Sequence, residues 1–228
     1  MYSDGDKELD EMNHAIIRTI CEQAKRSRDV ILVGISGAPG AGKSTLALAL
    51  VDQLNHEHAI SAQYCPMDGY HFTNQQLHEK QLTKHKGRID TFDAQSMKKD
   101  IDRLRSEEKP FYWPTYSREL HNPIKEGVEI RRETRVFIVE GNYIFFNEGE
   151  WRRIRDALDL KIFIEVPRDI LKKRLIERHL VGGKSEQEAQ NKVNKTDLPN
   201  ASLISSSSSA ADIVIDPLGK VLVQQGDK

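Results

Sequence analysis

Apolar residues along the chain cluster in short runs, which alternate with segments where apolar residues recur at helical spacing. The runs predict buried strands at residues 30–35 and 160–166, a central strand at 135–140 and short strands at 62–67 and 212–215. The helical spacing predicts helices at residues 9–24, 44–51, 96–105, 151–158, 167–180 and 185–193. Strands that alternate with helices are typical of an α/β fold of three layers, in which helices cover both faces of a parallel sheet.

The other segments lack a clear apolar repeat. We expect residues 1–7 to be disordered, and the serine run at 205–209 to be flexible or to cap a helix. Residues 70–90 are too polar for a core, so they should lie over the surface or over a substrate. Three prolines among aromatic residues at 109–124 favour an irregular segment or an edge hairpin.

The first predicted strand runs into a glycine-rich segment that ends in a lysine and a serine. Residues 37–44 match the pattern G-x-x-x-x-G-K-[ST] at every position. Such a loop, placed between a strand and a helix N-terminus, points backbone N–H groups at phosphate oxygens. We therefore expect a phosphate-binding loop in which nucleotide contacts come from Gly37, Ala38, Pro39, Gly40, Ala41, Gly42, Lys43, Ser44 and Thr45.

Two side chains of this loop predict the cofactors. Lys43 can reach the β- and γ-phosphates of a nucleotide and act in catalysis, and the Ser44 hydroxyl can ligate Mg²⁺. The loop thus predicts binding of ATP together with Mg²⁺. A glycine-rich turn with an incidental lysine is the alternative, and the flanking strand and helix disfavour it.

Two further strands are followed by, or end in, carboxylates. The carboxyl ends of parallel strands meet at one edge of a sheet, so Asp68 and Glu140 should lie near the phosphate loop. Asp68 could accept the proton of a hydroxyl that attacks the γ-phosphate, and Glu140 could support the Mg²⁺ ion. The alternatives are an ordinary Asp-Gly turn at residues 68–69 and a solvated strand end at Glu140.

The predicted helix at 167–180 is very basic. Arg174 and Arg178 lie four residues apart and so share one face, from which they could close over phosphates and stabilise the transferring charge. A solvated basic face is the alternative. The glycines at 182–183 are the hinge of a mobile lid or a simple helix stop.

Polar and aromatic residues in the connections could line a pocket for the phosphate acceptor, although each could equally be a surface residue. These residues are His71, Arg88, Asp90, Tyr116, Arg118, His121 and Asn142. Residues 194–197 spell N-K-x-D, which in GTPases recognises guanine. Here the string follows a polar helical stretch instead of a buried strand, and this disfavours guanine recognition.

Composition disfavours proteins that bind nucleic acid, lie on an anionic membrane or span a bilayer. The 228 residues are enough for one domain, and a net charge of −1 gives no attraction to nucleic acid or to an anionic membrane. The two cysteines form no disulfide pattern, and no apolar run approaches transmembrane length. We expect a cytoplasmic enzyme that acts on a small molecule. The sequence is compatible with a homodimer.

Taken together, the motifs resemble the phosphoribulokinase/uridine kinase family of P-loop kinases, which includes type I pantothenate kinase. The similarity covers the chain from about residue 30 to 215. Within the family it is greatest to a bacterial and fungal branch of uncharacterised nucleoside-kinase-like or fructose-transport-associated kinases. The strings that carry it are Pro66–His71, Asp90–Asp93, Trp113–Arg118, Val139–Tyr143 and Thr196–Asn200.

The resemblance implies a role for each group of site residues. It implies that Asp68 is the base, that Glu140 supports the metal, and that Arg174 and Arg178 belong to the lid. It also implies that acceptor contacts come from Asp90, Tyr116, Arg118 and His121. True uridine kinases carry an acidic-Ser-Phe-Tyr string where this chain has residues 68–71, and this departure argues against uridine as the acceptor.

We therefore expect one P-loop domain over residues 1–228, with an N-terminal helix at 1–28, an acceptor-binding excursion at 70–130 and a lid at 174–195. The expected activity is transfer of phosphate from ATP to a hydroxyl of a nucleoside, a sugar or a pantothenate-like alcohol. Two alternatives remain open, a nucleotide-dependent switch such as a GTPase and a non-catalytic ATP-binding regulator.

Overall fold

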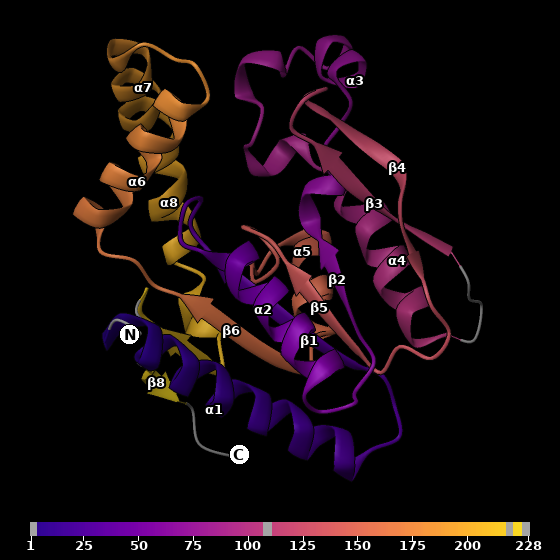
Figure 1. The fold of residues 1–228 in the computed structure, drawn as a ribbon. Coiled ribbons are helices and arrows are strands. Elements are labelled where there is room, and N and C mark those ends of the chain that lie inside the picture. The colour runs from indigo at the N-terminus through magenta and orange to yellow at the C-terminus, as the bar shows by residue number, and fades with distance from the viewer. Residues whose placement is uncertain (1–3, 107–110, 218–220, 225–228) are drawn as a thin grey trace.

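The central sheet has the α/β arrangement that the apolar pattern predicts. The computed structural model describes residues 4–106, 111–217 and 221–224 (Figure 1), and for residues 4–13 and 224 only the backbone. Within these residues the sheet has the strand order β2-β5-β1-β6-β7-β8, and only β7 and β8 pair antiparallel. Its strands are β1 (Ile31–Gly37), β2 (Ala62–Pro66), β5 (Val136–Glu140), β6 (Leu160–Ile164), β7 (Ile213–Ile215) and β8 (Val221–Gln224).

Alternating side chains of the strands divide the core into two layers. In β1, Ile31, Val33 and Ile35 pack on one face of the sheet, while Leu32 packs on the other. The first face is covered by α1 (Asp4–Arg26) and α2 (Lys43–His56), and the second by α4 (Ala94–Arg105), α5 (Gly149–Asp156) and α8 (Leu198–Ser205) (Figure 1). The helices thus form the two outer layers of a three-layer fold.

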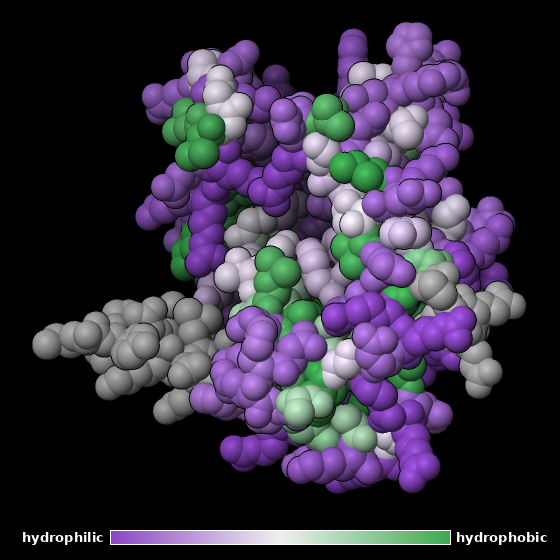
Figure 2. All heavy atoms as spheres, turned by 45° about the vertical axis from the view of Figure 1, so that its right-hand side comes forward, coloured by the Kyte–Doolittle hydropathy of each residue, from purple (hydrophilic) through white to green (hydrophobic). Residues whose placement is uncertain are grey.

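Two groups of elements rise beyond the carboxyl edge of the parallel strands, on opposite sides (Figure 1). The surface is hollowed between them, and both groups are mostly hydrophilic (Figure 2). One group holds α6 (Arg168–Val181), α7 (Glu186–Lys192), a π-helical turn (Val193–Asp197) and the start of α8. The other holds α3 (Asn74–Glu79), the hairpin of β3 (Phe111–Ser117) and β4 (Asn122–Ile130), and single turns at Met67–Tyr70, Thr83–His85 and Ile89–Thr91.

The hairpin is fixed to the sheet at its root. Trp113 of β3 is fully buried, and its indole Nε1 donates a hydrogen bond of 3.0 Å to the carbonyl oxygen of Pro66, at the end of β2. The backbone of Pro114 lies directly against Gly69, where a Cβ atom would collide with the Pro114 carbonyl group. The glycine after Asp68 is therefore required by this close approach.

Several sequence-based expectations need correction. Residues 4–7 are helical and not disordered, because α1 begins at Asp4; residues 1–3 lie outside the described residues. The pattern also missed α3, α8 and β8, which are short and have little apolar periodicity of their own. The serine run follows α8 into a turn at Ser208–Ala210, and Ser207 is buried there with its hydroxyl bonded to the Ile204 carbonyl, so the run ends the helix.

The contact between Gly69 and the hairpin makes a prediction about stability. Gly69→Ala forces the backbone of β3 away from residue 69, and we expect it to lower the free energy of unfolding by about 2–3 kcal/mol. Urea denaturation followed by circular dichroism measures this change.

Gly182→Ala is the matched control, because a Cβ atom there would meet its nearest neighbour, the carbonyl oxygen of Arg178, at 3.3 Å. We expect it to change the free energy of unfolding by less than about 1 kcal/mol. Equal and small effects of the two substitutions would show that the hairpin does not need the glycine.

Candidate active site

The phosphate-binding loop has the conformation that its glycines allow. Gly40 has φ 82° and Gly42, which caps α2, has φ 100°, a region that side chains other than glycine rarely adopt. The loop turns back on itself, so that the Lys43 Nζ atom donates a hydrogen bond of 3.0 Å to the carbonyl oxygen of Ala38. Lys43 is buried, and its ammonium group lies within the turn of the loop.

The buried carboxylate of Glu140 is contacted by side chains from two other parts of the chain, the start of α2 and the middle of β2. The Ser44 hydroxyl donates to its Oε2 atom at 3.1 Å, and the Tyr64 hydroxyl donates to the same oxygen at 2.7 Å. The Lys43 Nζ atom lies 3.7 Å from Oε1. The end of β5, the start of α2 and the middle of β2 therefore converge on one carboxylate.

Burial and neighbouring charges set the protonation of these groups. Burial raises the pKa of Glu140 and lowers the pKa of Lys43, and each group opposes the shift of the other. Burial also raises the pKa of Tyr64 far above its usual value, and the neighbouring carboxylate raises it further. The Tyr64 phenol consequently stays protonated and acts as a hydrogen-bond donor.

An Mg²⁺ ion fits the oxygen atoms of this site. Ser44 and Glu140 offer a hydroxyl and a carboxylate side by side, the hard ligands that Mg²⁺ prefers. Within the described residues, no cluster of three or more His, Cys, Asp or Glu side chains could hold a metal alone. Such a sparse set suits an ion that takes its other ligands from nucleotide phosphates and water.

Asp68 lies in the turn that follows β2, at the same edge of the sheet. Its side chain is open to solvent, yet the surrounding protein raises the pKa of its carboxyl group, while the cations of Lys43, Arg178 and Arg118 act to lower it. A carboxylate with open access and three nearby cations can receive a proton from a bound hydroxyl.

The two arginines of α6 differ in their relation to the site. The charge of Arg178 acts on both Lys43 and Asp68, whereas no such effect accompanies Arg174, which is half-buried one turn earlier. Neither side chain has a hydrogen bond or an ion pair within the described residues. Both guanidinium groups are therefore available to a ligand.

His71 lies at the start of the expected acceptor region, in an aromatic cluster. Its ring stacks on Phe92 with centroids 3.8 Å apart, and the Tyr116 ring lies 5.3 Å away. The Nδ1 atom is buried and has no hydrogen-bond partner among the residues that the structure describes. Burial, aided by the charge of Lys86, lowers the pKa of His71 to about 4, so the imidazole is neutral at pH 7.

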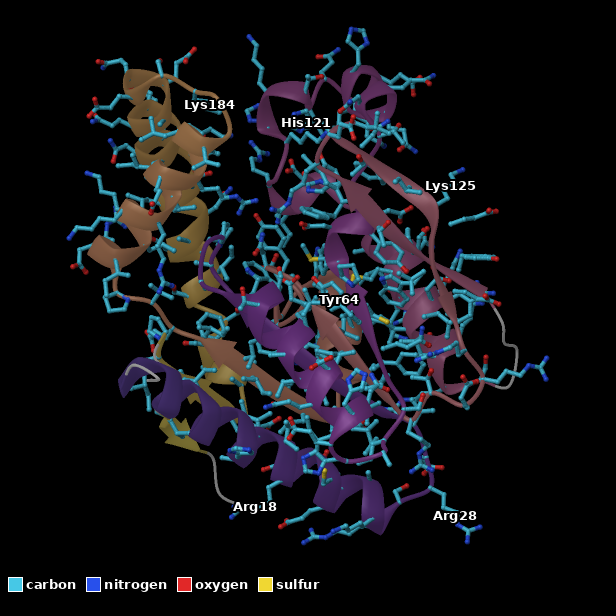
Figure 3. The ribbon with its side chains drawn as sticks, in the orientation of Figure 1. Arg18, Arg28, Tyr64, His121, Lys125 and Lys184 are labelled. Carbon is cyan, nitrogen blue, oxygen red and sulfur yellow. The ribbon has the colours of Figure 1, made fainter. Side chains whose placement is uncertain are left out.

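The other predicted acceptor residues occupy different positions. Arg88 and Asp90 pair with each other at 2.5 Å, and Arg118 is exposed. His121 lies at the hairpin tip with φ 47°, far above Tyr64 in Figure 3, and its carbonyl oxygen accepts a hydrogen bond from Lys86. Asn142 follows β5, and its carbonyl oxygen accepts one from Ser36.

The N-K-x-D string has a structural role. Residues 194–197 belong to the π-helical turn after α7, and not to the end of a strand. The Asp197 carboxylate lies 2.6 Å from the Nε2 atom of His179 on α6. This contact joins the π-helical turn to α6. It also engages the Asp197 carboxylate, which guanine recognition would need to be free.

A profile of the phosphoribulokinase/uridine kinase family matches residues 32–224. The chain belongs to this family. The kinase is 31% identical over 186 residues to YggC, an uncharacterised protein of Escherichia coli, an alignment that covers 81% of the chain and 77% of the relative. It is 27% identical over 157 residues to the pantothenate kinase of Yersinia enterocolitica, with 65% of the chain and 49% of that enzyme aligned.

Solved structures agree on the fold. The crystal structure of a candidate fructose transport system kinase from Silicibacter sp. TM1040 superposes with a TM-score of 0.79 at 32% identity, over 85% of the chain and 94% of that protein. The P-loop kinase fold expected from the sequence is therefore confirmed. Across the described part of the chain, no helix is both long and apolar enough to cross a bilayer.

Tyr64 and Phe92 are site residues that reasoning from the sequence missed. Tyr64 lies near the centre of the molecule in Figure 3, on a predicted short strand to which we assigned no site residue. A lone aromatic hydroxyl in such a strand is the signal that could have found it, because a buried phenol requires a partner. Nothing in the sequence indicates that this partner is Glu140.

The low pKa of His71 makes a prediction about acid stability. Between about pH 4 and 6.5 the unfolded chain binds a proton at His71 that the folded chain does not, so folding stability falls as the pH falls. We expect wild type to lose stability relative to His71→Phe by about 1.4 kcal/mol per pH unit within this window.

Urea denaturation at several pH values measures the difference. Asp68 and Glu140 titrate in both proteins, so their contributions cancel in the comparison. Parallel stability curves for wild type and His71→Phe would contradict the lowered pKa.

Proposed function

We propose that this kinase transfers the γ-phosphate of ATP to a hydroxyl of a small metabolite, with Asp68 as the base. One observation carries the proposal: an accessible carboxylate, Asp68, lies at the same sheet edge as the phosphate loop and the Ser44–Glu140 pair. A nucleotide site alone would serve a switch or a regulator equally well. A carboxylate beside it is what transfer to a hydroxyl requires.

The binding steps follow from the groups present. Backbone N–H groups of the loop, which every residue from 37 to 45 except Pro39 carries, receive the phosphates, and Lys43 exchanges the Ala38 carbonyl oxygen for a phosphate oxygen. Ser44 and Glu140 would hold Mg²⁺, which when bound neutralises charge on the β- and γ-phosphates. Arg174 and Arg178 of α6, the helix that packs against the phosphate loop, would stabilise charge on the transferring group.

The transfer step is balanced within this set of residues. The acceptor oxygen forms a bond to the γ-phosphorus as the bond from that phosphorus to the bridging oxygen of ADP breaks. The hydroxyl proton passes to the Asp68 carboxylate late in this step. The products are ADP and a phosphate monoester, and Asp68 then returns the proton to solvent, to which it is open.

In our proposal the acceptor binds to the excursion at residues 70–130, where His71, Tyr116 and Arg118 face the hollow. We propose a nucleoside, a sugar or a pantothenate-like alcohol. Relatives include a candidate uridine kinase of Schizosaccharomyces pombe, besides the pantothenate kinase and the fructose transport system kinase. The departure from the uridine kinase string at residues 68–71 favours the latter two kinds of acceptor.

A panel of acceptors tests the proposal against its rivals. Uridine, fructose and pantothenate are each incubated with enzyme, ATP and Mg²⁺, and acceptor-stimulated ADP release is measured together with the mass of the product. A switch would show tight preference for GTP and slow hydrolysis without acceptor. A regulator would bind ATP and phosphorylate no member of a broadened panel.

The role of Asp68 makes the sharpest prediction. Asp68→Asn keeps the shape of the side chain and removes the base, so we expect kcat to fall about 10²- to 10⁴-fold. The dissociation constant for ATP should change little, because the triphosphate is bound by the phosphate loop. Steady-state kinetics with the best acceptor and calorimetry with ATP measure the two quantities.

Asp102→Asn is the matched control, since Asp102 is an exposed residue of α4 that pairs with Lys98. We expect it to leave both quantities unchanged. Full activity of Asp68→Asn would refute the assignment, because asparagine suits an Asp-Gly turn as well as aspartate does. Loss of ATP binding would move Asp68 to the metal site.

A lid over residues 174–195 makes a second prediction, on dynamics. Within the described residues, Arg174 and Arg178 have no hydrogen bond or ion pair, so ligands that pair them should order the segment. We expect amide hydrogen exchange there to slow about 10-fold or more when Mg²⁺, a non-hydrolysable ATP analogue and the best acceptor are bound together. Peptides from β5 and β6 serve as the reference, and equal exchange in free and liganded enzyme would exclude the lid.

A further inference from the structure

The Tyr64 hydroxyl is a part of the site to which the transfer mechanism assigns no step. We propose that Tyr64 is a positioning residue of the metal site, whose hydroxyl holds the Glu140 carboxylate in the orientation that favours nucleotide bound together with Mg²⁺ over nucleotide alone. This inference rests on the proposed function, in which Glu140 supports the metal. It concerns a contact within the chain and needs no knowledge of the acceptor.

The position of Tyr64 is fixed by the sheet. Strands β2 and β5 pair in parallel, with Tyr64 opposite Ile138 and Pro66 opposite Glu140, so the phenol reaches forward along the strands to the carboxylate. The start of β2 is tied to α2, because the Asn55 side chain bonds to both the N–H and the carbonyl of Ala62. The backbone that carries the Tyr64 hydroxyl is therefore held in place on both sides.

The two oxygens of Glu140 are used differently. Oε2 accepts hydrogen bonds from both Ser44 and Tyr64, which together satisfy its lone pairs. Oε1 faces the Lys43 ammonium at 3.7 Å. With Oε2 held by two donors, the carboxylate cannot rotate freely, and Oε1 is the oxygen left to face a cation.

This arrangement also explains why a hydroxyl is present at this position. Tyr64 is partly buried, and its ring packs with the apolar layer beneath α2, where phenylalanine would pack as well. The hydroxyl adds nothing to that packing, and it donates a hydrogen bond to Glu140 beside the Ser44 hydroxyl. Removal of a group that hydrogen-bonds to a metal ligand and orients it commonly lowers metal affinity about 10- to 100-fold.

Calorimetry of ADP binding tests the proposal without turnover. ADP is titrated into wild type and Tyr64→Phe, each in buffer with EDTA and in buffer with MgCl₂. For the variant we expect unchanged affinity in EDTA and a gain on adding Mg²⁺ that is about 10-fold smaller than in wild type. A role in packing alone would shift both affinities together or neither.

Two further variants make the outcome decisive. Tyr112→Phe removes a half-exposed hydroxyl of β3 that has no hydrogen bond within the described part of the chain, and it should behave as wild type. Glu140→Gln should remove most of the Mg²⁺-dependent gain. Circular dichroism melts verify that each variant is folded.

The results separate the two proposals. If Glu140→Gln loses the gain and Tyr64→Phe keeps it, the positioning role is overturned and the metal site stands. If Glu140→Gln keeps the gain, the metal site itself fails and the role of Tyr64 fails with it. Equal weakening of ADP binding by Tyr64→Phe in both buffers also overturns the positioning role.

Discussion

A buried ammonium group and a buried carboxylate lie side by side at the edge of the sheet, and the remainder of the site is arranged around them. Lys43 and Glu140 are 6% and 7% exposed. Removing either charge from water costs several kcal/mol, which their attraction offsets only when hydrogen bonds satisfy both groups. The Ala38 carbonyl, the Ser44 hydroxyl and the Tyr64 phenol supply those bonds.

The same pair fixes the lysine of the phosphate loop. Lys43 has a carbonyl oxygen and a carboxylate of its own chain as partners. Arg178 is different, because it lies near Lys43 and Asp68 with no partner of its own within the described residues. Positive charge thus remains unmatched on one side of the hollow, which suits a polyanionic ligand.

The parts of the fold and site that sequence could predict are those whose signals are local. The phosphate loop is one unbroken string, and its position follows from the strand before it and the helix after it. Asp68 and Glu140 could be placed together because parallel strands end at one edge. Tyr64 could not, because its bond to Glu140 spans 76 positions and depends on side-chain reach between neighbouring strands. Short elements such as α8 were missed because tertiary contacts, and not periodicity, stabilise them.

The hairpin of β3 and β4 is buried at its root and exposed at its tip. Its root is held by the Trp113 indole on Pro66 and by the backbone contact at Gly69, beside the proposed base. The side chains of residues 118–121 at its tip are exposed, while the His121 carbonyl oxygen accepts a hydrogen bond from Lys86. Mutations at the tip can therefore accumulate without moving the base. Under the proposed function, a descendant of this kinase could acquire a new acceptor by drift in a handful of surface positions while its chemistry stayed intact.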